Sequence, residues 1–261
     1  MPVAFTQEII PQQWNAALLR SSITNKMIAL GYLNESTSEN DMYFSFDLPT
    51  AAPKDKGYLR INVSQPSGTS IKIQQWFSDA YTTNNLVNSV SSFSDTTGNS
   101  VSIGYGSNEN FPIKFCTFKS PEIALLAVIR SDNNASNFNL GFVFPSVRPS
   151  WWDNNSLYGF CGAGNDYSIL KSCIANQINN NSIDISYFLQ SAPNVINPGG
   201  TRDLIRRIIL SSCTGGIIVG ATTTDIGIIG ASGIPPLTQI QDSNQVWVNL
   251  KTNNSMAIRI V

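Results

Sequence analysis

The spacing of hydrophobic residues changes near residue 40, from a helical period to the alternation typical of β-strands. Between Gln12 and Leu30, apolar residues recur on one helical face and predict a helix: Ala16, Leu19, Ile23, Met27 and Leu30. A second apolar set falls on nearly the opposite face: Trp14, Ala17, Leu18 and Ile28. A helix that is apolar on two sides usually lies between two layers. The second set therefore indicates either burial within the same domain or contact with a neighbouring subunit, for which Trp14, Leu18 and Ile28 are the candidates.

Beyond the polar loop that ends at Asp41, alternation of apolar and polar residues predicts antiparallel strands. Residues 42–48 alternate, as do 59–63, and the turn residues of 65–68 connect the latter to a strand at 71–76 in a predicted hairpin. Further strands are predicted at 101–105 and 113–118, after a linker rich in Ser, Thr and Asn at 84–100. The pattern indicates a mainly β protein, with an antiparallel β-sandwich-like architecture, an N-terminal helix and few short helices.

The segment 121–130 fits two structures. Ser120 followed by Pro and Glu is a possible helix start, whereas the unbroken apolar run from Ile123 to Ile129 is typical of a fully buried strand. We interpret it as a strand that pairs with Phe138–Phe144. A short helix is considered within 168–188.

The last sixty residues contain short apolar segments separated by turn residues, which is typical of an all-β region. Strands are predicted at 207–210, 216–220, 226–230, 245–250 and 256–261, and the turn at 251–254 joins the last two in a hairpin. The expected division is an N-terminal segment 1–40, a β subdomain 41–130 and a β subdomain 131–261. One continuous β domain is the alternative.

Composition argues against catalysis. The 261 residues include no histidine, which excludes Ser-His-Asp and Cys-His arrangements, and only 13% are charged, against roughly 25% in an average soluble domain. Asparagine makes up roughly one residue in nine. The net charge of −1 and the scattered Lys and Arg give no nucleic-acid footprint. We expect no catalytic residues, no cofactor and no metal.

The four cysteines lie too far apart for a Cys-x-x-Cys pair: Cys116, Cys161, Cys173 and Cys213. We expect them to be reduced and buried, with two disulfides as the alternative. The N-terminus lacks the pattern of a signal peptide, and no apolar run reaches the ~18 residues of a membrane span. The sequence therefore predicts a soluble protein without membrane insertion.

One aromatic cluster has the composition of a ligand platform. Trp151, Trp152 and Tyr158 lie close in sequence to Asp153 and to several Asn residues. Aromatic faces edged by carboxylate and amide groups suit a sugar ring and its hydroxyls. The other interpretation is that the rings fill the core or a subunit interface. Asp153, Asp166 and Asp184 lie in an Asn-rich region where ordinary turns account for them, so a glycosidase-type carboxylate pair is not favoured.

Four stretches of the C-terminal half resemble tailed-bacteriophage virion proteins of the tail and baseplate class: 144–152, 200–212, 216–233 and 247–261. Each is a sequence pattern typical of strands, and the region that contains them, from Phe142 onward, is a little under half of the chain. The resemblance implies a non-enzymatic structural component of the tail, baseplate or fibre-attachment region, which assembles in several copies with itself and other virion proteins. It also implies assembly in the host cytoplasm. The alternative is a sugar-binding adhesin that uses the region of Trp151 and Trp152 to bind a host surface glycan.

Overall fold

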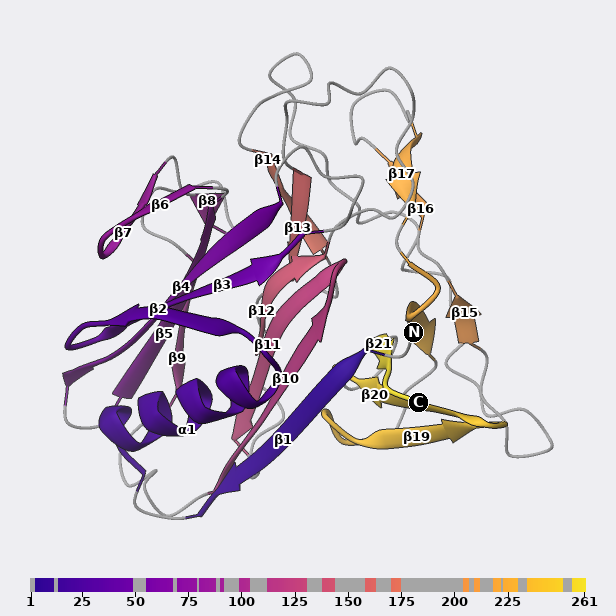
Figure 1. Ribbon diagram of the computed structural model, residues 1–261. Helices are drawn as coiled ribbons and strands as arrows, with labels where there is room; N and C mark the ends of the chain where they lie inside the picture. Colours follow the sequence, from indigo (N-terminus) through magenta and orange to yellow (C-terminus); the bar gives the residue numbers. More distant parts are fainter. Residues whose placement is uncertain are drawn as a thin grey trace.

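The computed structural model shows a mainly β protein with antiparallel sheets and a helix near the N-terminus (Figure 1). It describes residues 3–11, 14–48, 55–67, 70–78, 80–87, 90–91, 99–103, 112–130, 138–143, 158–162, 170–174, 204–206, 209–211, 218–221, 223–229, 234–250 and 255–261. The predicted fold class is confirmed.

Two six-stranded sheets form the larger part of the fold, and we call them sheet A and sheet B. Sheet A has the order β1 (Ala4–Ile10), β10 (Ile113–Ser120), β11 (Ile123–Arg130), β12 (Phe138–Val143), β13 (Tyr158–Gly162) and β14 (Leu170–Ile174). Sheet B has the order β2 (Leu33–Thr37), β3 (Asp41–Asp47), β4 (Lys56–Ser67) and β5 (Ser70–Ser78), and β5 pairs with both β8 (Val90–Ser91) and β9 (Asn99–Ile103). A small hairpin, β6 (Ala80–Thr82) with β7 (Asn85–Val87), follows β5.

The inner faces of sheets A and B enclose one hydrophobic core. Alternate residues of the strands point into it, as the period of two in the sequence predicts. Sheet B contributes Phe44, Leu59, Ile61, Val63, Ile73 and Phe77, and sheet A contributes Ile10, Ile113, Phe115, Ala124 and Leu126. Packing against Gly57 is tight, because a Cβ there would lie 2.8 Å from both Phe46 Cζ and Phe77 Cε2.

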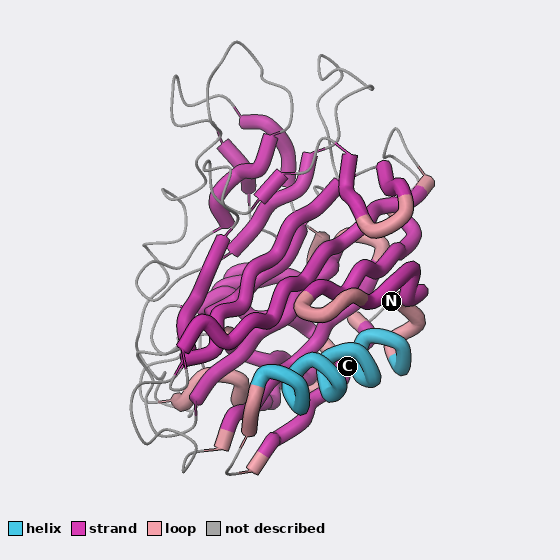
Figure 2. The backbone as a smooth tube through the Cα atoms, turned by 90° about the vertical axis from the view of Figure 1, so that its left-hand side faces the viewer, coloured by secondary structure: helices cyan, strands magenta, loops and turns pink. Residues whose placement is uncertain are grey.

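Helix α1 (Ala16–Ala29) contacts β1, at the edge of sheet A, and β2, at the edge of sheet B (Figure 2). It buries Ala16, Leu19, Ile23 and Met27 in the shared core. Asn15 caps its N-terminus, since the Asn15 side-chain oxygen accepts a hydrogen bond from the Leu18 N–H at 2.8 Å.

The C-terminus of α1 ends in a Schellman motif. Gly31 has φ of +83°, a left-handed conformation that glycine adopts without steric cost. The Gly31 N–H donates to Ile28 O at 2.8 Å, and the Tyr32 N–H donates to Met27 O at 3.1 Å. This turn directs the chain from the helix into the edge strand of sheet B.

A third, C-terminal sheet has the order β15 (Leu204–Arg206), β18 (Ile226–Ile229), β21 (Ser255–Arg259), β20 (Gln245–Asn249) and β19 (Gln239–Asp242). A separate pair is formed by β16 (Ile209–Ser211) and β17 (Ile218–Ala221). The C-terminal sheet adjoins sheet A: Lys114 Nζ donates to Leu237 O, and the Val3 N–H donates to Arg259 O at 3.1 Å. In Figure 1, sheet B, sheet A and the C-terminal sheet follow one another from left to right.

Several sequence predictions are confirmed. The hairpin of 59–76 is β4 with β5, where Leu59 pairs with Phe77 and Val63 with Ile73. The segment from Ile123 is the strand β11 and pairs with β12 as predicted. The C-terminal hairpin is β20 with β21.

Other predictions differ from the structure. The helix begins at Ala16, after the Asn15 cap, and not at Gln12. The segment 84–100, predicted as a linker, contains β7 and β8, and the segment 170–174, within the stretch considered for a helix, is the strand β14. Sheet A contains strands from all three of the segments 1–40, 41–130 and 131–261, since β1 pairs with β10 and β11 pairs with β12.

Candidate functional site

Exposed large apolar side chains occur on three elements, β1, α1 and β2, of which α1 contacts both strands (Figures 1 and 2). They are Ile9 on β1, Leu18 and Ile28 on α1, and Leu33 on β2, with exposed fractions of 56%, 44%, 48% and 56%. We call these four residues the edge surface. Among the described residues, Val261 is the other large apolar side chain that is this exposed.

The structure separates the three residues predicted as an interface. Leu18 and Ile28 are exposed on the outer face of α1, whereas Trp14 is only 5% exposed and belongs to the core. The placement of Trp14 on the outer face is therefore wrong. Trp14 precedes the Asn15 cap, so it does not follow the helical period, and it joins the same apolar cluster as Leu19, four residues beyond the cap.

Sequence analysis missed Ile9 and Leu33 as part of this surface. Ile9 is one of two adjacent isoleucines at the end of β1, and Leu33 follows the turn after α1. The alternation of side chains in β1 identifies Ile9 and Ile10 as lying on opposite faces. Which of the two is exposed depends on how the sheets pack: Ile10 is 2% exposed and Ile9 is 56% exposed.

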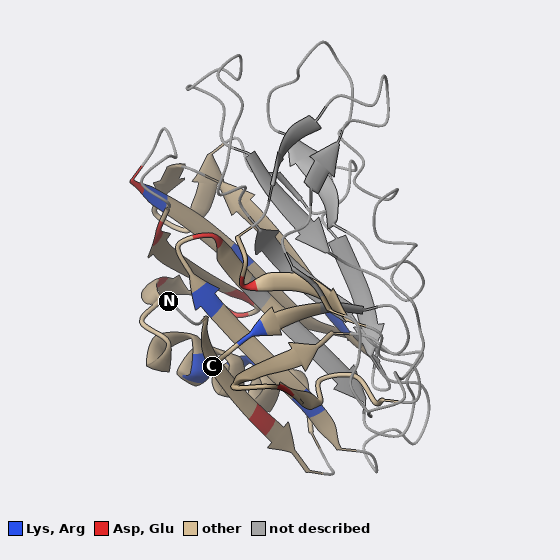
Figure 3. Cartoon of the chain, turned by 90° about the vertical axis from the view of Figure 1, so that its right-hand side faces the viewer, with Lys and Arg blue, Asp and Glu red and all other residues tan. Residues whose placement is uncertain are grey.

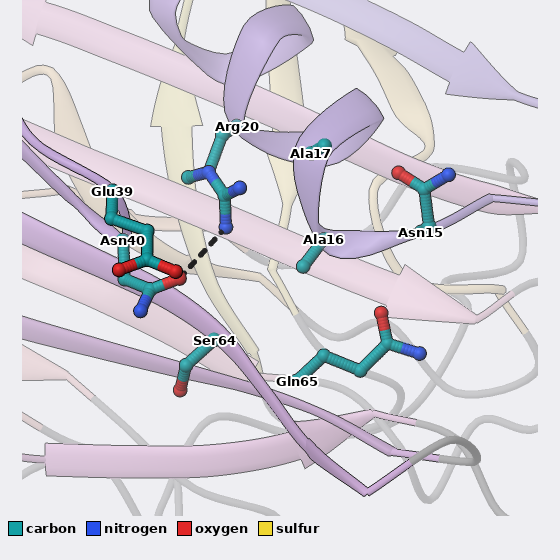
Figure 4. Close-up of a pocket in the computed structure, with 8 residues that line it drawn as sticks. All are labelled: Asn15, Ala16, Ala17, Arg20, Glu39, Asn40, Ser64 and Gln65. Atoms are coloured by element: carbon teal, nitrogen blue, oxygen red, sulfur yellow. Dashed lines mark hydrogen bonds between the residues drawn. The ribbon is translucent and has the colours of Figure 1, made fainter.

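A polar groove of about 630 Å³ lies beside the first turn of α1 (Figure 4). Its lining combines the helix with the turn after β2 and the end of β4: Asn15, Ala16, Ala17, Arg20, Glu39, Asn40, Ser64 and Gln65. Arg20 Nη1 donates to Asn40 Oδ1 at 3.2 Å and to Val63 O at 2.7 Å, which fixes the guanidinium against sheet B. Apart from Ala16 and Ala17, the lining consists of amides, a hydroxyl and one charge of each sign, so the groove suits polar groups of a partner.

The outer face of sheet B carries a row of connected polar and aromatic side chains. Arg60 donates two hydrogen bonds to the Asp41 carboxylate, Nε to Oδ1 at 2.9 Å and Nη2 to Oδ2 at 3.0 Å, and Asn62 Nδ2 donates to Asp41 Oδ1 at 2.7 Å. The Arg60 guanidinium also lies 4.3 Å from the centre of the Trp76 ring. Such a network holds its members in fixed rotamers and balances their charge.

Tyr81 attaches the β6–β7 hairpin to this face. Its ring lies 5.6 Å from the rings of both Tyr43 and Tyr58, and its hydroxyl is 2.8 Å from Ser36 Oγ of β2. Burial raises the pKa of Tyr43, with Arg60 acting in the opposite direction. The tyrosines thus act as packing residues that cover part of β2.

Two further titratable groups are shifted by burial and have structural partners. The Tyr32 hydroxyl donates to Phe118 O at 3.0 Å, and burial raises the pKa of Tyr32 far above its ordinary value. Lys119 Nζ donates to Gly31 O and lies 5.0 Å from the centre of the Tyr32 ring, and burial lowers the pKa of Lys119. Both side chains tie the end of α1 to sheet A.

Of the four cysteines, Cys116 is described as a free, buried thiol on β10, and burial raises its pKa to about 12. The backbone register places Cys161 opposite Lys171 and Cys173 opposite Gly159 on neighbouring strands. Cys213 lies outside the described residues.

Most of the predicted ligand platform cannot be placed. Trp151, Trp152 and Asp153 lie outside the described residues, and Tyr158 begins β13, with its backbone opposite Ile174. Among the residues that the structure describes, no group of three or more Cys, Asp or Glu side chains is arranged to hold a metal ion. No helix in the described ranges is long and apolar enough to span a membrane.

No protein-family model, no curated protein and no solved structure matches this chain. The function is therefore inferred from the residues and their arrangement. Of the features described, the edge surface combines exposed apolar area with two sheet edges, which is the composition of a protein–protein contact.

Proposed function

We propose that this chain is a non-enzymatic structural component of a bacteriophage virion, of its tail, baseplate or fibre-attachment region, and that it acts through multi-copy assembly. The observation that carries the assembly role is the edge surface. Four of the five exposed large apolar side chains of the described residues lie on β1, α1 and β2. Helix α1 contacts both strands, and exposed apolar residues concentrated on neighbouring elements support an interaction site there.

The charge distribution supports the same proposal. With 13% charged residues and a net charge of −1, the chain has little electrostatic repulsion between copies. Figure 3 shows Lys and Arg interspersed with Asp and Glu on the side of the C-terminal sheet. A surface of this kind allows neutral copies to pack closely.

The resemblance of the C-terminal half to tail and baseplate proteins supplies the virion context of the proposal. The virion role can be tested directly on purified particles of the phage that encodes the chain. Peptide mass spectrometry of gradient-purified virions should detect the chain in several copies per particle. Its absence from the particle, with its presence in the infected cell, would refute the virion role.

Native mass spectrometry and light scattering of the purified chain test the assembly role. We expect an oligomer that weakens when Leu18 and Ile28 are both changed to Ser, because both side chains are exposed in the single chain and their loss removes apolar contact area. The matched control changes Ser21 and Asn25, which are exposed on α1 and do not line the groove, to Ala. A wild-type chain that is monomeric at every concentration would contradict the assembly role.

A further inference from the structure

Edge strand β1 has an unpaired side. Its seven residues pair with β10 without a register shift, from Ala4 opposite Lys119 to Ile10 opposite Ile113. Within the described residues, no other strand pairs with β1. An edge of this length presents a row of backbone N–H and C=O groups that can pair with another strand.

Two other edge strands of the described part, β2 and β19, carry features that oppose such pairing. Strand β2 has an irregular register between Asn34 and Ser36, and the Ser36 hydroxyl contacts Tyr81 of the β6–β7 hairpin. Strand β19 has four residues and ends in Asp242. Bulges, covering elements, short length and charges are the usual means of protecting an edge.

Strand β1 is longer than both of these strands and regular throughout, although α1 contacts it and the Val3 N–H directly before it donates to Arg259 O at 3.1 Å. It contains no proline and no lysine, and its register has no bulge. Its one charged residue, Glu8, is engaged by Lys26 of α1 at 3.7 Å. Ile9, which is 56% exposed, follows Glu8 on the opposite face of the strand.

The sequence of β1 is complementary to itself in one antiparallel register. With Gln7 opposite Gln7 of a second copy, all seven residues overlap, and Phe5 lies opposite Ile9 of the other copy. Thr6 then lies opposite Glu8, so no like charges meet. Centring on Glu8 would place two carboxylates opposite each other, and centring on Thr6 would shorten the overlap.

We propose that two copies of this chain pair through β1, antiparallel and centred on Gln7, so that sheet A continues from one copy into the other. The inference rests on the proposed function, because it assigns a contact through which copies assemble. A two-fold axis through Gln7 makes the contact isologous, with the same residues buried on both sides. The exposed Ile9 side chain then packs against Phe5, whose ring already lies 5.2 Å from that of Phe118.

Disulfide trapping tests the register. Thr6→Cys and Glu8→Cys variants, carried on subunits of different size, should form a mixed disulfide on mild oxidation, and neither variant should cross-link with itself. Thr6 and Glu8 lie on the face of β1 opposite to that of Gln7, whose side chain is 4.0 Å from Cys116. This choice keeps the introduced thiols away from Cys116. Self-cross-linking of Thr6→Cys alone or of Glu8→Cys alone would overturn the register.

Charge at the edge tests the contact itself. Ile9→Lys should raise the dissociation constant of the dimer about tenfold or more, because lysine on an edge strand opposes pairing. Val261→Lys is the control, since Val261 is 57% exposed and its backbone oxygen accepts from the Val246 N–H of β20. Circular dichroism confirms that both variants fold.

The outcomes separate the two proposals. An assembled wild type that gives no mixed disulfide and is unaffected by Ile9→Lys overturns β1 pairing alone. A wild type that stays monomeric overturns β1 pairing together with the assembly role.

Discussion

Arg259 of β21 and Asp225, in the turn that precedes β18, are joined twice. Their side chains form an ion pair, and the Arg259 N–H donates to Asp225 O at 2.9 Å. The Asp225 side chain is 9% exposed and that of Arg259 is 23% exposed, so water screens the pair only in part. The pair fixes the end of β21 against the turn that precedes β18.

Removing one partner of this pair should destabilise the fold. Asp225→Ala leaves the Arg259 guanidinium half-buried without its partner, and we expect the free energy of unfolding to fall by about 3 kcal/mol. Urea denaturation followed by tryptophan fluorescence measures the change. Glu39→Ala is the control because Glu39 is exposed, and it should change stability by less than about 0.5 kcal/mol. Equal effects of the two substitutions would show that the pair is not stabilising.

Deletion of residues 256–261 should abolish soluble expression. Strand β21 lies between β18 and β20 in the middle of the C-terminal sheet, so its loss removes the partner of both strands and leaves two new edges. The fraction of protein in the soluble extract measures the effect. Removal of Val261 alone, which lies beyond β21, should leave the protein soluble. A soluble and assembly-competent chain without 256–261 would show that β21 is peripheral.

Cys116 should be unreactive in the folded protein, and it should make stability depend on alkaline pH. Burial raises the pKa of its thiol from 9.0 to about 12, so the unfolded chain ionises first as pH rises. The contribution of Cys116 is therefore fully present below pH 9 and is lost between pH 9 and about 12. Alkylation at pH 8, read by mass mapping of the Cys116 peptide, should require denaturant.

The matched variant Cys116→Ala tests the pH effect. It should cost about 1 kcal/mol at neutral pH, because a small buried group is lost, and it should flatten the fall in stability above pH 9. Fast alkylation of native Cys116 would contradict its burial. An intact mass lower by the hydrogens of a disulfide would contradict the expectation that the four cysteines are reduced.

The sequence predicts an element when the spacing of its own apolar residues shows which of its faces is buried. The alternation of Met42, Phe44 and Phe46 identifies β3 because these residues share the face that enters the core. The other face is buried as well, with Tyr43 and Ser45 4% and 0% exposed, and the sequence gives no sign of that. The unbroken run of β11 is harder to interpret, since it alternates little. This run forms a strand because it pairs with β10 on one side and with β12 on the other in sheet A.

Features that depend on contacts between residues far apart in the sequence cannot be predicted from the spacing of apolar residues. Trp14 has the helical phase of an outward residue, yet it lies before the cap and packs into the core. The edge position of β1 follows from its pairing with β10, and no local signal in residues 4–10 indicates that partner. The exposure of Ile9 is a consequence of that pairing, which is why the edge surface was only half predicted, through Leu18 and Ile28.

The pairing of β1 with β10 also sets an order of events during synthesis. Thr6 and Thr117, whose hydroxyls meet in the sheet, are 111 positions apart, so β1 leaves the ribosome long before its partner exists. At translation rates of about 5–20 residues per second, the delay is roughly 5 to 20 seconds. During that time β1 has both of its sides unpaired. Nascent chains on one polysome could therefore join through β1 before sheet A is complete, and slower translation between the two strands would lengthen this exposure.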